Sequence, residues 1–198
     1  ASLRIAYLQT DFLTPEDRRE AIDDLDSFDD LEKLYVRILQ NVRKQCTGPK
    51  AWENVQRLFQ WVIVARRSLQ TNELQIALAI VVGQPVLKRR CLPQFASTIT
   101  KMSGALIEVS KENTVRFIHL SALNLFTGAM QSLDNPGRGI PNPLVVDARA
   151  ANWCVAMSCI SYLLHTLPGQ PLSESSSCRS DCRQLLQKYP LLLYAAQH

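Results

Sequence analysis

A histidine stands where an expected strand meets an expected helix, in the stretch RFIHLS at positions 116–121. At such a junction His119 can contact a phosphate group, or it can fill a core position with its ring hydrogen-bonded to the backbone. Ser121 follows His119 too closely for a nucleophile and its base, and we expect its hydroxyl to cap the next helix. The other histidines, His165 and His198, have no Asp or Cys placed to form a triad. The sequence therefore predicts no catalytic residue and leaves both interpretations of His119 open.

Neither a metal site nor a complete nucleotide site is predicted from the sequence. The six cysteines, at positions 46, 91, 154, 159, 178 and 182, form no Cys-x2-Cys pair of the kind found in zinc sites. We expect them to be reduced thiols. No G-x-x-x-x-G-K-[ST] loop occurs, so the chain cannot cradle a triphosphate by itself. Any NTPase activity would reside in a neighbouring domain, and this chain is predicted not to be an enzyme.

Composition indicates a globular chain with no membrane segment. Hydrophobic residues make up 46% of the 198 residues and charged residues 20%, which is enough apolar material for a core. The net charge of +4 is small for a dedicated nucleic-acid binder, so nucleic acid is not expected as a partner. No apolar run approaches the roughly 18 residues of a membrane span, and no signal peptide is evident. We therefore expect a cytoplasmic protein, of which this chain is a segment.

Helix signals and apolar spacing predict a mainly helical chain. The expected helices cover positions 14–26, 29–47, 52–67, 71–82 and 92–103. Arg66 and Arg67 are expected at the C-terminal end of the third helix, where the helix dipole favours cations. Thr71 is the expected cap of the next helix, and Gly104 is expected to close the last one.

A β-hairpin is predicted directly after these helices. Positions 105–109 and 114–119 favour strands, and the polar turn SKEN joins them at 110–113. Three helices followed by a two-stranded hairpin is the order of a winged helix, so the predicted fold class is mainly α, a winged helix with flanking helical segments. The predicted regions are an N-terminal helical segment at 1–50, the winged-helix domain at 51–128 and a helical connector at 129–198.

The connector is expected to contain, near its start, a loop rich in turn residues at 134–143. Asp147 should cap its first helix, and a Ser-rich break at 173–177 should separate that helix from the last ones. The aromatic residues predicted to lie in the core are Trp52, Phe59, Trp61 and Trp153. Trp61 has a second interpretation, as a contact with a missing domain or with the adjoining helices. The apolar stretch at 191–193 is expected to be exposed and to need a cover.

Five blocks in the same order resemble the fungal NACHT-type NTPases of the STAND class, in the region after their nucleotide-binding domain. The blocks are LxxLYxxIL at 31–39, WVxxARRxL at 61–69 followed by EL at 73–74, VRFIHLS at 115–121, CISYLL at 159–164 and YPLL at 189–192 with YAAQH at 194–198. The resemblance runs from about position 31 to the end of the chain. The pattern is broken in three places: Gln70 stands where a capping threonine is expected, Leu123-Asn124 replaces a Lys-Glu or Gln-Glu pair, and Leu193 replaces an acid.

The resemblance implies a regulatory part of an NLR-like signal-transduction NTPase. Such a part packs on its own NTPase domain, holds the ADP-bound closed state and passes opening to C-terminal repeats, often of ankyrin type. It implies that His119 contacts the β-phosphate of ADP in the intact protein. The cofactors implied are ADP or ATP in the intact protein and none in this segment, with homo-oligomers forming on activation.

Two other functions stay open at the level of sequence. A winged helix that reads DNA would place its third helix, here 93–103, in the major groove, and the basic loop at 88–90 would contact phosphates. That helix offers a single cation, Lys101. A plain protein-interaction scaffold without any nucleotide role is the third alternative.

Overall fold

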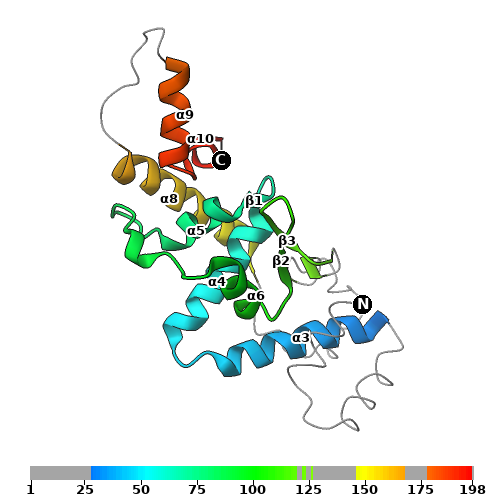
Figure 1. Ribbon diagram of the computed structural model, residues 1–198. Coiled ribbons are helices and arrows are strands. Elements are labelled where there is room, and N and C mark those ends of the chain that lie inside the picture. Colours follow the sequence, from blue (N-terminus) through cyan, green and yellow to red (C-terminus); the bar gives the residue numbers. More distant parts are fainter. Residues whose placement is uncertain (1–27, 120–121, 124–125, 127–145, 168–177, 198) are drawn as a thin grey trace.

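The computed structural model describes residues 28–119, 122–123, 126, 146–167 and 178–197 (Figure 1). Its helices are α3 (Phe28–Gln45), α4 (Pro49–Val64), α5 (Thr71–Ala79), α6 (Phe95–Met102), α8 (Ala148–Thr166), α9 (Cys178–Lys188) and α10 (Leu192–Gln197), with a 3-10 turn η1 (Lys88–Arg90). Its strands are β1 (Leu69–Gln70), β2 (Ile107–Val109) and β3 (Thr114–Phe117). The helix expected over 14–26, the loop at 134–143 and the Ser-rich break at 173–177 lie outside the described residues.

The central part of the chain is a winged helix. Its elements follow the order α4, β1, α5, α6, β2, β3, and the strands form an antiparallel sheet in the order β1-β3-β2. Leu69 pairs with Val115 across β1 and β3, and Ile107 pairs with Phe117 across β2 and β3. The predicted fold class is confirmed. The prediction of two strands is wrong in one respect, because the short connection after α4 adds β1 as a third strand.

Helix α4 forms the centre of the winged-helix core. Gly48 and Pro49 start it, since proline suits the first turn of a helix. Its apolar face is buried, and Trp52 and Phe59 lie in the core as predicted. The Phe59 ring lies 4.6 Å from that of Phe126 and 6.1 Å from that of Phe117 on β3. These aromatic contacts fix the sheet against the helix and thereby set the position of the chain that leaves β3.

Both strands of the hairpin are shorter than predicted, β2 at its start and β3 at its end. Positions 105–106 do not belong to β2, because Gly104 and Ala105 both adopt positive φ, at 61° and 63°, and turn the chain after α6. β3 ends at Phe117, so positions 118–119 lie beyond the sheet. The polar turn is confirmed: the amide of Ser110 donates to the carbonyl of Thr114 at 2.8 Å.

The segment before the winged helix packs on the turn that follows α6. Among the described side chains of helix α3, Leu34, Ile38 and Val42 are buried. A side chain at Gly104 would collide with Cγ2 of Ile38 and would lie 3.0 Å from Cγ2 of Val42. The glycine that closes α6 therefore also permits the close approach of α3.

The C-terminal helices cover the other side of α4. Helix α8 packs against both α4 and α10, and the Asp147 carboxylate caps it by accepting from the amide of Arg149 at 2.8 Å, as predicted. The prediction that Trp153 lies in the core is wrong, since its side chain is 69% exposed. Of the terminal stretch expected to be exposed, Leu191 is fully buried and Leu193 is 48% exposed.

Candidate functional site

His119 lies two residues beyond the end of β3, and its side chain is exposed. It borders an open hollow of about 360 Å³, which we call the His119 hollow. The hollow is lined by Val62, Ala65, Arg67, Ser68, Leu69, Val115, Arg116, Phe117, His119 and Leu123. The wall thus comes from the end of α4, from β1 and from β3, three elements that the winged-helix sheet holds together.

The lining of the His119 hollow favours an anion over a cation. Arg67, Arg116 and His119 are its charged or titratable members, and no carboxylate stands among the described residues that line it. Both guanidinium groups have acidic partners outside the lining. Arg116 donates through Nε to Oε1 of Glu108 at 2.9 Å, and this ion pair is exposed. An anion in the hollow would therefore meet the imidazole of His119 together with two partly neutralised guanidinium groups.

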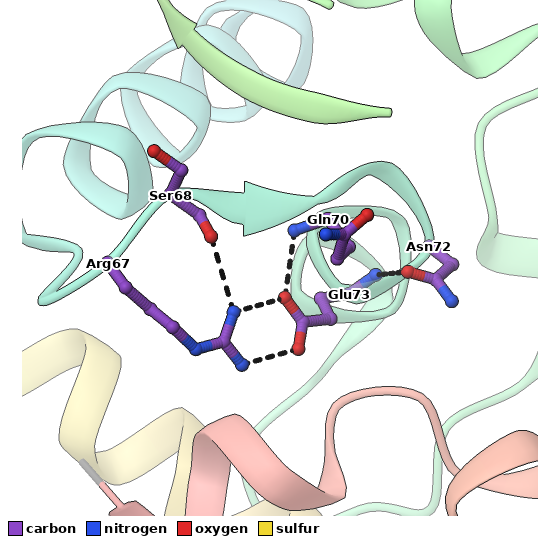
Figure 2. A network of polar contacts seen from close by, with 5 residues as sticks. All are labelled: Arg67, Ser68, Gln70, Asn72 and Glu73. Atoms are coloured by element: carbon purple, nitrogen blue, oxygen red, sulfur yellow. Dashed lines mark hydrogen bonds and ion pairs between the residues drawn. The ribbon is translucent and has the colours of Figure 1, made fainter. Parts of the chain in front are cut away.

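Arg67 is the centre of a polar network that joins the end of α4 to the start of α5 (Figure 2). Its two terminal nitrogens donate to the two carboxylate oxygens of Glu73, Nη1 to Oε2 at 2.8 Å and Nη2 to Oε1 at 2.6 Å. Nη1 also donates to the carbonyl of Ser68 at 3.2 Å. The side chain of Glu73 is buried, and its hydrogen bonds with the guanidinium raise the pKa of Arg67. Such two-pronged pairs fix the direction of both side chains.

The start of α5 uses the same carboxylate. Oε2 of Glu73 accepts from the amide of Gln70 at 2.8 Å, and the amide of Glu73 donates to Oδ1 of Asn72 at 2.9 Å (Figure 2). Gln70 occupies the position before the first helical residue, so the prediction that Thr71 caps the helix is wrong. The carboxylate of the third helical residue thus satisfies the amide at the cap position, which is the reciprocal bond of a capping box.

The expected position of Arg66 and Arg67 at the end of a helix is also corrected. Helix α4 ends at Val64, and Ala65 already has an extended backbone. Arg67 therefore lies in the connection to β1, from which it reaches Glu73 rather than the last carbonyl groups of α4.

The Arg67 network extends to the last helix of the chain. The guanidinium carbon of Arg67 lies 5.1 Å from the ring centre of Tyr194, and the Trp61 ring lies 6.0 Å from that of Tyr194. Tyr194 and Trp61 are both buried, and burial raises the pKa of Tyr194. The prediction that Trp61 lies in the core is confirmed, and so is its contact with the adjoining helices. A rim residue of the His119 hollow is thus in direct contact with α10.

Other features singled out from the sequence lie apart from the hollow. His165 is exposed on α8, and Lys88, Arg89 and Arg90 are exposed on η1. Ser121 and His198 lie outside the described residues. Cys46, Cys91, Cys154 and Cys159 are free thiols, and burial raises the pKa of Cys159 to about 11. The described residues contain no group of three side chains that could hold a metal ion.

Sequence reasoning did not find the pairing of Arg67 with Glu73. The available signal was weak: an acid placed three residues into a helix, next to buried apolar positions, needs a cationic or amide partner. Two arginines preceded it, and only the turn between α4 and β1 determines which of them reaches the carboxylate.

The winged-helix part of the chain matches a known family. Residues 42–132 match the family described as GPI inositol-deacylase, winged helix domain. The match begins near the end of α3 and contains all three strands, and it covers less than half of the chain. Neither a curated protein nor a solved structure matches the chain significantly. Among the described helices, none is both long and apolar enough to cross a membrane.

Proposed function

We propose that this chain is the non-catalytic regulatory part of a cytoplasmic NACHT-type STAND NTPase of the fungal group. It would pack on the nucleotide-binding domain of its own protein, hold the ADP-bound closed state and relay opening to C-terminal repeats. Its winged helix matches a family found in NACHT-type proteins, which supports this placement. The five sequence blocks described above support the finer assignment.

The placement of His119 is the observation that carries the proposal. The residue lies two residues beyond the central strand of the sheet and is exposed at the edge of an open hollow with two arginines in its lining. A diphosphate presented by a neighbouring domain would meet a cationic rim without a carboxylate among the described lining residues. His119 would act as a contact that senses the phosphate, not as a catalyst.

The Arg67 network supports the second half of the proposal, the relay. Arg67 belongs to the rim of the hollow and at the same time contacts Tyr194 on α10. A switch needs contacts that differ between two states, because a ligand shifts an equilibrium only by its differential affinity for them. A movement of the nucleotide-binding domain at His119 would reach α10 through this contact, and the repeats expected beyond it would follow.

Binding to nucleic acid has less support. The third helix of the winged helix, α6, carries one cation, Lys101, and the exposed cations of η1 lie on a separate turn. A winged helix that reads DNA needs side chains on this helix to reach base edges and phosphates. A scaffold without a nucleotide role would leave the rim of the hollow without a function.

The role of His119 can be tested in the parent protein that carries the nucleotide-binding domain. Replacing His119 by Ala should lower the retention of ADP by roughly tenfold or more, because one charged hydrogen bond to phosphate is lost. Retention is measured from the dissociation of labelled ADP, and self-association by sedimentation.

The control is His165→Ala, which removes an exposed imidazole that does not line the hollow. It should release ADP at the unaltered rate. Unchanged ADP release and an unchanged oligomeric state in His119→Ala would show that His119 has no part in nucleotide control.

A further inference from the structure

Helix α8 is apolar on two opposite faces. One face, with Val155, Cys159 and Tyr162, is buried in the molecule. The opposite face exposes Trp153 to 69%, Ile160 to 49% and Leu164 to 72%. With the half-buried Met157 these side chains follow each other at steps of four, three and four residues, which places them along one line of the helix. We call this line the α8 stripe.

An exposed apolar stripe of this kind is normally buried against another protein surface. A surface helix usually turns a polar face to water, and a helix that is apolar all round is usually buried. Three large apolar side chains in a row, one of them tryptophan, form a continuous apolar patch of the type that marks a protein–protein contact. None of the residues of the α8 stripe lines the His119 hollow, so the patch is separate from the site described above.

The surroundings of the α8 stripe are basic. Helix α8 contains no Asp or Glu, and the exposed Arg149 stands one turn before Trp153 on the same side of the helix. The carboxylate of Asp147, just ahead of the helix, is occupied by its first amides. The other end of the stripe, at Leu164, lies in the last turn of the helix.

A basic turn is fixed beside this second end. The amide of Gly83 donates to Oγ of Ser161 at 2.8 Å, and the amide of Val86 donates to Oγ1 of Thr166 at 3.4 Å. These bonds hold the connection between α5 and η1 against α8, as its course in Figure 1 also shows. The connection leads directly into the exposed cations Lys88, Arg89 and Arg90. Exposed cations therefore stand near both ends of α8, Arg149 at the first end and the turn at 88–90 near the second.

We propose that the α8 stripe is a docking site for an acidic amphipathic helix of a partner protein. An apolar seam of three or four side chains on the partner would cover Trp153, Ile160 and Leu164, with Asp or Glu residues toward Arg149 and toward the turn at 88–90. A second copy of this chain fits less well, because it would place one acid-free, cation-bearing helix against another.

The test uses two designed helical peptides of about 18 residues, long enough to span the stripe at 1.5 Å per residue. They share one leucine seam and differ only in the polar positions, which are Glu in one peptide and Lys in the other. Trp153 reports binding, since Trp52 and Trp61 are buried and its own emission should shift to the blue when it is covered. The acidic peptide is expected to bind roughly tenfold or more tightly than the basic one, and its affinity should fall with added salt.

Matched variants assign the binding to the stripe. Leu164→Gln should weaken binding of the acidic peptide by roughly tenfold. Leu193→Gln, the same change at an exposed leucine of α10, should leave it unaltered. Circular dichroism confirms that both variants are folded.

Three results would overturn the proposal. The first is the absence of binding, and the second is equal binding of the acidic and basic peptides. The third is a dimer in sedimentation without peptide that Leu164→Gln dissolves, which would show that a second copy covers the stripe.

Discussion

Arg67 neutralises a buried carboxylate, and this role sets it apart from the other arginine that lines the His119 hollow. Glu73 has an exposed side-chain fraction of 7%, whereas Glu108, the partner of Arg116, has one of 42%. Removing the cation from a buried pair leaves a charge with incomplete compensation, while a pair in water contributes little. Both ion pairs join an arginine to a glutamate, but the Arg67–Glu73 pair is therefore expected to contribute more to the free energy of unfolding than the Arg116–Glu108 pair.

This inequality gives a prediction at the level of single residues. Arg67→Ala should lower the free energy of unfolding by about 2 kcal/mol, because Glu73 loses two hydrogen bonds and keeps only the amide of Gln70. Arg116→Ala, the matched control, should cost less than about 1 kcal/mol. Urea unfolding followed by circular dichroism measures both. Equal costs for the two variants would contradict the assignment of Arg67 as the structural residue of the rim.

Part of the candidate site follows from the sequence alone. His119 was predicted as the last residue of a strand at a strand-to-helix junction, whereas β3 ends at Phe117 and His119 lies two residues beyond it. The pairing of Arg67 with Glu73 and its contact with Tyr194 were not predicted. The first depends on the backbone of a short turn, and the second joins residues more than a hundred positions apart, for which local patterns contain no signal.

Among the helices and strands, those that depend on local sequence signals were predicted, and those that depend on distant residues were not. Helices α3, α4, α6 and α8 were predicted because their apolar stripes and end signals are local. Strand β1 was not predicted, since two residues, Leu69 and Gln70, are too few for a period of two to appear. It exists because Val115 and Thr114 of β3 offer a free edge beside it.

Gly104 ends α6 and also allows α3 to approach closely, so a side chain at this position should disturb the packing of two helices. Gly104→Ala should lower the free energy of unfolding by more than about 2 kcal/mol. The positive φ of 61° costs about 1 kcal/mol for a residue other than glycine, and the collision with Ile38 adds overpacking. Urea unfolding of the variant measures the loss.

Gly83 is the matched control for this change. It also has a positive φ, of 81°, but a methyl group there would meet no atom within 4 Å. Gly83→Ala should therefore cost only about 1 kcal/mol, the backbone part alone. If both variants lost the same stability, the close packing of α3 on this turn would not contribute.

At the scale of the whole molecule, helix α8 buries one apolar face against its neighbours and exposes the opposite one. Trp153 was assigned to the core because tryptophan is usually buried, but the apolar period of α8 marks two faces and does not say which of them meets α4. Burial of Val155 and Tyr162 and exposure of Trp153 and Leu164 depend on where the neighbouring helices lie. Such information is in the tertiary structure alone.

Tyr194 joins the C-terminal helices to the winged helix, and its removal tests whether the two parts unfold together. Its ring contacts Trp61 and Arg67, so Tyr194→Ala should lower the free energy of unfolding by about 3 kcal/mol. Tyr194→Phe keeps the ring and should cost only about 1 kcal/mol.

In the unaltered chain, unfolding followed by tryptophan fluorescence and by circular dichroism should give coincident curves, because α4, α8 and α10 share one core. Tyr194→Ala should shift both curves to lower urea, whereas a winged helix that keeps its own unfolding midpoint in this variant would show that α10 is not coupled to it.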